Sequence, residues 1–109
     1  MRIISGKFKG RVLLTSIDNS IRPTSDRARE MIFSTLHSIL LKNKRSLKDS
    51  SILDCFCGTG ILGIEAVSRG AKNVTFIDSS NNSLNICKFN CKELEIANIS
   101  NLIKLNIIK

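Results

Sequence analysis

The 109-residue chain has no tryptophan, no tyrosine and a single proline, Pro23. It also has no run of about 18 apolar residues, which is the length that a membrane-spanning helix needs. Its first residues lack the long apolar stretch of a secretory signal. We therefore expect a cytoplasmic protein with no membrane contact. The length and the 42% hydrophobic content suit one core.

Acidic residues are scarce as well, since 9 Asp and Glu stand against 17 Lys and Arg, a net charge of +8. The excess is confined to residues 1–48, which hold 11 basic and 3 acidic residues, whereas residues 49–109 hold 6 of each. A basic region of this kind is typical of proteins that bind nucleic acid. The alternative is a solvated, lysine-rich surface.

Four cysteines are present, at positions 55, 57, 87 and 91. Disulfides are not expected in a reducing cytosol, and the C-x-C and C-x3-C spacings differ from the C-x2-C pairs common in zinc sites. Cys87 and Cys91 fall in line with Leu84 and Leu94 on a predicted helix. We therefore expect the cysteines to pack in the core and expect no metal site.

The N-terminal residues 2–14 are predicted to form an extended basic arm. Gly6 and Gly10 favour bends, so a hairpin is expected. Lys7, Lys9 and Arg11 alternate with other residue types, and this period of two predicts that the three cations share one strand face.

A helix is predicted to follow a polar loop over residues 15–23. Thr24 or Ser25 is a suitable N-cap, and Asp26 in the first turn complements the helix dipole. The helix is expected to end near Leu41, before a polar, basic linker over residues 42–50. Its predicted apolar stripe consists of Ala28, Met31, Ile32, Leu36, Ile39 and Leu40.

The remainder alternates between short apolar runs and helical patterns. Strands are predicted at 51–54, 74–78 and 102–108, with helices at about 61–69 and 81–94; Gly70 ends the first of these helices. Alternating strands and helices predict an α/β fold with buried parallel strands and right-handed crossovers.

The most informative motif is Gly58-Thr59-Gly60-Ile61-Leu62-Gly63, which lies between a predicted strand and a predicted helix. Its letters match the dinucleotide fingerprint, and Asp78 ends the next strand, where an acid that binds ribose is expected. The pattern suits a nicotinamide cofactor or S-adenosylmethionine, and a glycine turn without a ligand is the third alternative.

Asp54, just before the glycines, favours S-adenosylmethionine. A carboxylate beside a pyrophosphate is repelled, whereas the ammonium and sulfonium groups of S-adenosylmethionine are both positive. The glycines allow the backbone to approach the ligand without a Cβ in the way.

Two longer blocks resemble one family. They are Met1–Arg11 with Arg22–Phe33, and Leu53–Ala71, and together they are similar to the RsmD family of bacterial methyltransferases, which act on a guanine exocyclic amine in 16S ribosomal RNA. The resemblance implies an N-terminal β-hairpin and helix, followed by the first half of a Rossmann-like class I methyltransferase sheet. Residues 1–50 would bind RNA and close the cofactor pocket, and residues 51–109 would form part of the S-adenosylmethionine-binding domain.

The resemblance also implies roles for individual residues, with small-subunit ribosomal RNA or the ribosomal particle as the partner. Asp78 would hold the ribose, and Asn106 stands where the family normally has an aspartate near the adenine. Arg22, Pro23, Thr24 and Arg27 would close the cofactor pocket from the N-terminal side. The implied cofactor-binding residues are Asp54, Phe56, Gly58, Gly60, Asp78, Asn106 and Thr24. The implied RNA contacts are Arg2, Lys7, Lys9, Arg11, Arg22 and Arg27.

One family motif is missing, the Asp/Asn-Pro-Pro-Tyr/Phe clamp that holds the target amine. No catalytic residue is therefore assigned, and we expect the chain alone to bind cofactor weakly and to transfer no methyl group. We also expect poor stability, because the first strand is left as an exposed edge of the sheet. A second chain would supply the missing half. The alternatives are a non-enzymatic RNA-binding remnant and an NAD-binding domain.

Overall fold

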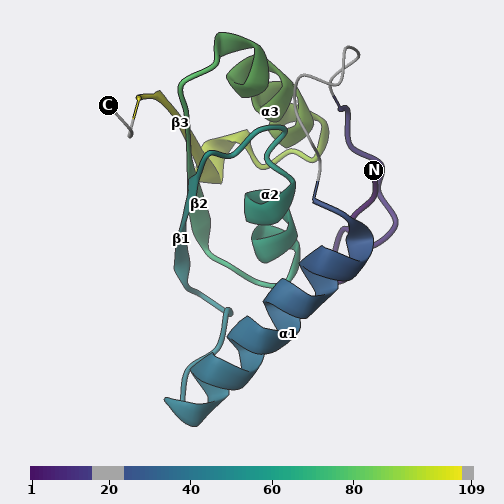
Figure 1. Ribbon diagram of the computed structural model, residues 1–109, viewed down its shortest axis with the longest axis vertical. Coiled ribbons are helices and arrows are strands. Elements are labelled where there is room, and N and C mark those ends of the chain that lie inside the picture. The colour runs from purple at the N-terminus through teal and green to yellow at the C-terminus, as the bar shows by residue number, and fades with distance from the viewer. Residues whose placement is uncertain (16–23, 107–109) are drawn as a thin grey trace.

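The computed structural model of the protein describes residues 1–15 and 24–106. Three strands form one parallel sheet in the order β1-β2-β3. Helices α2 and α3 lie against one face of this sheet, and α1 crosses the outer side of α2 (Figure 1). The predicted α/β alternation and parallel pairing are thus confirmed. The elements in chain order are α1 (Asp26–Lys42), β1 (Ser51–Cys55), α2 (Ile61–Ser68), β2 (Asn73–Asp78), α3 (Asn81–Glu93), the 3-10 helix η1 (Ala97–Ile99) and β3 (Ser100–Lys104).

The N-terminal arm folds back on itself, as predicted. Arg2 and Val12 form an antiparallel bridge, and Ile3 both donates to Arg11 O and accepts from Gly10 N. The tip, residues 5–10, consists of bends and turns. The expectation that Lys7, Lys9 and Arg11 share one strand face is therefore wrong, because positive φ angles at the two glycines turn the chain between them.

Helix α1 begins as predicted, because the Ser25 side chain caps it by accepting from the N–H of Ala28. Its predicted apolar stripe is confirmed only in part: Ala28, Leu36 and Leu40 are half-buried, and Leu36 packs against the core, whereas Met31, Ile32 and Ile39 are exposed. The buried residues of α1 are Arg29 and Phe33, whereas Ile32 is 44% exposed. The reason is that Arg29 forms an ion pair with Glu65 on α2, and the Phe33 ring stacks with the guanidinium of Arg69 just after that helix. These contacts select the buried face of α1 and leave Met31, Ile32 and Ile39 on its exposed side.

The sheet is covered on one face. Val74 and Phe76 on the covered face have no exposure, whereas Leu53 is 62% and Ile103 is 45% exposed on the other. The expectation of buried strands is therefore met on one face only, because both crossover helices lie on the same side of the sheet. Strand β1 pairs with β2 alone among the described residues, so it is an edge strand, as predicted. Strand β3 begins and ends earlier than predicted, at Ser100 and Lys104, and residues 107 and 108 of the predicted strand lie outside the described residues.

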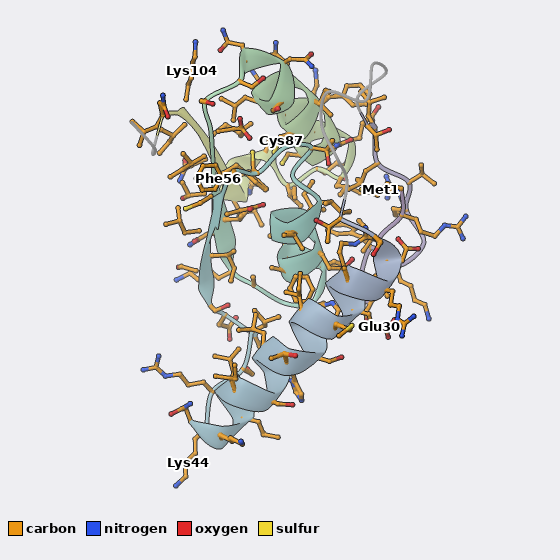
Figure 2. All side chains as sticks on the ribbon, in the orientation of Figure 1. Met1, Glu30, Lys44, Phe56, Cys87 and Lys104 are labelled. Atoms are coloured by element: carbon orange, nitrogen blue, oxygen red, sulfur yellow. The ribbon has the colours of Figure 1, made fainter. Side chains whose placement is uncertain are left out.

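Three of the four cysteines lie in the core, which confirms their predicted packing. Cys57, Cys87 and Cys91 are buried together with Leu84 and Leu94. Cys87 is on the side of α3 that packs against Gly60, in the segment that joins β1 to α2 (Figure 2). Cys55 is exposed, so the prediction is wrong for this residue, which ends the edge strand. No described helix is long and apolar enough to cross a membrane.

Candidate cofactor site and nucleic-acid interface

The loop between β1 and α2 is wound through left-handed backbone conformations. Phe56, Gly58 and Gly60 have φ angles of 59°, 56° and 88°. A bulky residue in this region costs on the order of 1–3 kcal/mol, and such strain concentrates at ligand sites. Gly60 caps α2 without a side-chain hydrogen bond, so the first N–H groups of this helix face the loop.

Two glycines allow α2 to approach its neighbours. A Cβ on Gly60 would lie 2.5 Å from Cys87 Sγ on α3. A Cβ on Gly63 would lie 2.5 Å from Phe76 Cε1 on β2 and 3.1 Å from Asp54 Oδ2. The contacts with Cys87 and Asp54 hold this segment against α3 and β1. The glycine motif therefore has a packing role that is independent of any ligand.

Asp54, the last residue but one of β1, carries a nearly buried carboxylate and is 9% exposed. Its Oδ2 accepts from the N–H of Gly63 at 3.0 Å. Burial raises the pKa of Asp54 to about 6, the Gly63 N–H opposes this rise, and the negative charge of Asp78 adds to it. An ionised Asp54 is therefore costly in this structure, and a nearby cation would remove that cost.

Asp78 is the last residue of the neighbouring strand β2, at the same edge of the sheet. Its Oδ2 accepts from Gly58 N at 3.0 Å, and its Oδ1 accepts from Ser80 N at 2.9 Å. Each carboxylate oxygen can accept a second hydrogen bond. The half-buried Asp78 side chain is therefore fixed in orientation and still able to accept from a pair of hydroxyl groups.

The remaining predicted cofactor residues are placed as follows. Phe56 is 61% exposed beside the glycine loop, and Figure 2 shows it at the sheet. Asn106 is exposed just beyond β3, and the N–H of Leu105 donates to Asp78 O at 3.0 Å, which keeps this end of the chain beside β2. Thr24 is half-buried just before α1. Arg22 and Pro23 lie outside the described residues.

A buried charge network joins the N-terminal hairpin to α2, and the sequence analysis missed it. Glu65 has no exposure and accepts from the N–H groups of Ile4 and Ser5 at 3.0 and 3.1 Å and from Arg69 Nε at 3.0 Å. Arg29 Nε lies 3.8 Å from Glu65 Oε1. Glu65 is the one acidic residue in the otherwise largely apolar α2, and that contrast could have identified it.

Arg29 extends this network to the start of α1. Its guanidinium is fully buried and donates to Thr24 O at 2.7 Å, to Arg2 O at 2.6 Å and to Asp26 Oδ1 at 2.7 Å. The segment before α1 is thereby held to the hairpin.

Asn90 makes a second connection that the sequence did not indicate. Its amide oxygen accepts from Leu14 N at 2.8 Å, and its Nδ2 donates to Leu14 O at 3.1 Å and to Thr59 O at 3.0 Å. The end of the hairpin and the glycine loop therefore share one side chain of α3.

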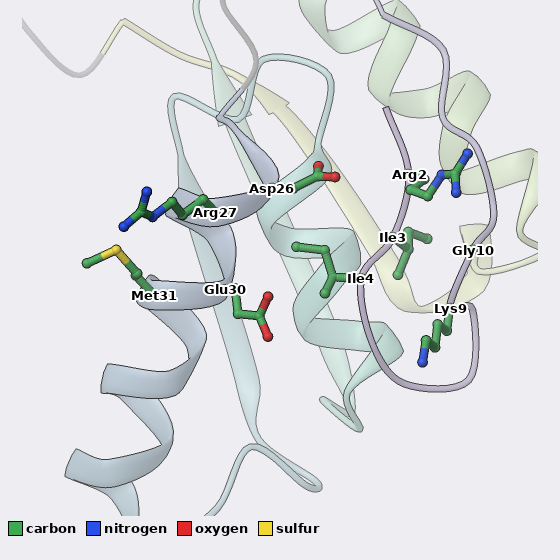
Figure 3. Close-up of a pocket in the computed structure, with 9 residues that line it drawn as sticks. All are labelled: Arg2, Ile3, Ile4, Lys9, Gly10, Asp26, Arg27, Glu30 and Met31. Carbon is green, nitrogen blue, oxygen red and sulfur yellow. The ribbon is translucent and has the colours of Figure 1, made fainter.

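The structure brings together three of the six predicted RNA-binding cations. Arg2, Lys9 and Arg27 line one cavity of about 550 Å³ between the hairpin and α1 (Figure 3). Lys7 instead lies 5.0 Å from the centre of the Phe8 ring. Arg11 donates to Glu93 O on α3 at 3.3 Å, and Arg22 lies outside the described residues.

Comparison with known proteins identifies the family. The profile of the family described as conserved hypothetical protein 95 matches residues 1–108. The chain belongs to this family. It is 38% identical to the ribosomal RNA small subunit methyltransferase D of Buchnera aphidicola (subspecies Acyrthosiphon pisum) over 106 residues, which are 97% of this chain and 51% of the relative. It is 41% identical to the protein of that name in Escherichia coli K12 over 78 residues, 72% of this chain and 36% of the relative. The resemblance to the RsmD family is thereby confirmed, and the chain spans about half the length of the curated relatives it matches.

Solved structures give the same result for the fold. A structure from Escherichia coli described as a methyltransferase matches with a TM-score of 0.78 and 32% identity, over 97% of this chain and 52% of that one. The PRMT1 enzyme–prozyme complex of Trypanosoma brucei with AdoHcy matches with a TM-score of 0.54 and 26% identity, over 70% and 21% of the two chains. The sheet is thus the first part of a class I methyltransferase fold, as predicted.

Proposed function

We propose that this chain binds S-adenosylmethionine and forms the cofactor-binding part of a methyltransferase that acts on a guanine exocyclic amine in small-subunit ribosomal RNA. The observation that carries the proposal is the buried carboxylate of Asp54, with its raised pKa, at the mouth of a strained glycine loop. A cofactor with two positive groups satisfies this carboxylate, whereas a pyrophosphate does not.

The donors and acceptors present suit the rest of the cofactor. Asp78 has free acceptor positions for the two ribose hydroxyls, and the side-chain oxygen of Asn106 is an acceptor for the adenine amine. Gly58 and Gly60 leave room for the ligand to approach the backbone, and exposed Phe56 offers an apolar contact. When bound, the cofactor supplies an electrophilic methyl group on a sulfonium.

In this proposal residues 1–50 bind RNA and close the cofactor pocket, and residues 51–109 hold the cofactor. Arg2, Lys9 and Arg27, which share one cavity, contact RNA phosphates together with Lys7, Arg11 and Arg22. Arg22, Pro23, Thr24 and Arg27 close the cofactor pocket in this proposal. Among them, Thr24 is held in place because its carbonyl oxygen accepts a hydrogen bond from the buried Arg29. The buried network thereby fixes the position of Thr24 at the start of α1.

Methyl transfer requires the target nitrogen to be held in line with the methyl group. The 109 residues contain no Pro-Pro-aromatic sequence that could hold it. Among the described residues, β1 pairs with β2 alone, and Leu53 on this strand is exposed. We therefore propose that the 109-residue chain binds cofactor weakly and transfers no methyl group. Further sequence, or a second chain, that completes the sheet would supply the clamp.

The test combines two measurements on the 109-residue chain. Equilibrium dialysis with labelled S-adenosylmethionine should show saturable binding, and incubation of the same mixture with unmethylated small-subunit particles should leave the RNA unlabelled. Incorporated label would refute the proposed inactivity, and absence of cofactor binding would refute the cofactor site.

An RNA-binding remnant without a cofactor is the second candidate, favoured by the cavity that gathers three cations. It predicts salt-dependent RNA binding that is unchanged in Asp54→Ala and Gly58→Ala, with no binding of S-adenosylmethionine. A parallel dialysis with NAD distinguishes a nicotinamide-binding domain from these two candidates, because only such a domain would bind NAD.

A further inference from the structure

The cavity between the hairpin and α1 is more than a cluster of positive charge. Its volume of about 550 Å³ is within the range of small-molecule sites. Apolar side chains of Ile3, Ile4 and Met31 form part of its lining, and the carboxylate of Glu30 is directed from α1 into the space that faces Ile4 (Figure 3). None of the residues proposed to hold the cofactor lines it.

Glu30 is out of place in a surface that binds only phosphates, because its charge repels them. The neighbouring acid, Asp26, is held by Arg29 at 2.7 Å. Within residues 1–15 and 24–106, Glu30 makes neither an ion pair nor a side-chain hydrogen bond, although Arg27 is three residues away on the same helix. Among the described residues, neither oxygen of Glu30 has a hydrogen-bond partner, so both can accept from a ligand.

Base chemistry decides which ligand suits this carboxylate. On its Watson–Crick edge, guanine presents two adjacent N–H donors, N1–H and N2–H, which match the two oxygens of a carboxylate. Adenine and cytosine place a donor beside an acceptor, and uracil places its donor between two acceptors, so each would set a lone pair against Glu30. Proteins that bind single-stranded RNA read this edge of unstacked bases.

We propose that the cavity holds an unstacked guanine of the RNA, distinct from the guanine that is methylated, with Glu30 accepting from N1–H and N2–H. Ile4 and Met31 contact the faces of the base, which accounts for a methionine that is 63% exposed without a ligand. Arg2 and Lys9 at the rim neutralise the adjoining phosphates. The inference rests on the proposed RNA-binding function and adds a point of sequence recognition to it.

The test measures base preference with short single-stranded RNAs that differ at one central nucleotide, guanine, inosine or adenine, in polyuridine flanks. Fluorescence anisotropy with the full 109-residue chain should show a preference for guanine over adenine of about tenfold, the size of one bidentate contact. Inosine, which lacks the N2 amine, should fall between them. Chemical shifts of the Met31 and Ile4 methyl groups should move with the guanine RNA.

Glu30→Gln provides the decisive variant. Glutamine offers one acceptor beside one donor, which matches adenine, so the preference should reverse toward adenine. The matched control is Glu93→Gln, which removes the same charge from an exposed position on α3. It should strengthen binding to every RNA equally and keep the preference for guanine.

The outcomes separate this inference from the function on which it rests. Salt-dependent RNA binding with no preference between guanine and adenine would overturn the guanine site and leave the proposed function intact. A preference for guanine that Glu30→Gln leaves unchanged would also overturn it. No RNA binding at all would overturn both.

Discussion

The backbone N–H of Gly58 donates to Oδ2 of Asp78 at 3.0 Å, and this bond joins the glycine loop after β1 to the carboxyl end of β2. The other oxygen of Asp78 accepts from Ser80 N at the start of α3. One side chain therefore sets the position of the loop, of the next helix and of the proposed ribose acceptors. The affinity of any ligand that binds Asp78 will therefore depend on the position of the glycine loop, of α3 and of the Asp78 carboxylate oxygens.

Asp78→Asn tests this relationship. An amide has one acceptor oxygen where the structure uses two, so either Gly58 or Ser80 loses its partner. We expect denaturant unfolding to show a loss of about 1–2 kcal/mol in the free energy of unfolding. We expect calorimetry to show an affinity for S-adenosylhomocysteine that is at least about tenfold weaker. Glu95→Gln, at an exposed position after α3, serves as the control. An unchanged affinity in Asp78→Asn would argue against the ribose role.

The glycine loop allows a matched comparison of close contact with backbone strain. Gly60 and Gly10 have nearly equal positive φ angles, 88° and 85°. A Cβ on Gly60 would meet Cys87 Sγ at 2.5 Å, whereas a Cβ on Gly10 would meet nothing within 4 Å.

Gly60→Ala should therefore destabilise the fold by about 1–3 kcal/mol more than Gly10→Ala, because only the first combines strain with overpacking. Thermal unfolding of the two variants side by side measures the difference. Equal losses would mean that α3 moves aside and that the contact between the loop and Cys87 is loose.

The raised pKa of Asp54 predicts a pH dependence of stability. The folded state holds the Asp54 proton more tightly, with a pKa of about 6 against about 3.9 when unfolded. The contribution of Asp54 to stability is therefore fully present below about pH 3.9 and is lost as pH rises through 6, by up to roughly 3 kcal/mol in total. Asp54→Asn should remove this slope, and denaturant unfolding at several pH values measures it. An identical slope in both proteins would contradict the shift.

The same carboxylate predicts the pH dependence of cofactor binding. A positive ligand favours ionised Asp54, so affinity for S-adenosylmethionine should rise by up to about tenfold per pH unit below 6 and level off above it. Asp54→Asn should bind more weakly, with a profile that is flat near pH 6. Calorimetric titrations of both proteins from pH 5 to 8 measure the two profiles. The same pH dependence in both would contradict the role of Asp54.

Glu65→Gln tests the buried network behind the hairpin. Removal of the charge leaves Arg29 and Arg69 without their common partner, in a site where Glu65 and Arg29 have no exposure. We expect a loss of about 3–5 kcal/mol in stability and faster hydrogen exchange at the amides of Ile4 and Ser5. Glu93→Gln should change neither, and normal protection of both amides in Glu65→Gln would show that the hairpin is held by other contacts.

Local signals in the sequence were sufficient for much of the fold. The Ser25 cap, the end of α2 before Gly70 and the alternation of strands with helices all depend on residues near in sequence, and each is confirmed. The grouping of Asp54, Gly58 and Asp78 could also be predicted, because the carboxyl ends of neighbouring parallel strands meet at one edge.

Partners distant in sequence decided the rest. The buried face of α1 depends on Glu65 and Arg69, which a periodicity of aliphatic residues does not reveal. Asn90 reads as one more polar residue on a helix, although it holds both Leu14 and Thr59. The exposure of Leu53 reflects which face the crossover helices cover, and strand composition alone does not specify that.

The most direct test of the cofactor site is equilibrium dialysis of labelled S-adenosylmethionine against the 109-residue chain at pH 7.5, with S-adenosylhomocysteine and NAD as competitors. The account predicts saturable binding at one site, displaced by S-adenosylhomocysteine but not by NAD, and at least about tenfold weaker in Asp54→Asn. Displacement by NAD, or equal binding by the folded Asp54→Asn variant, would contradict it.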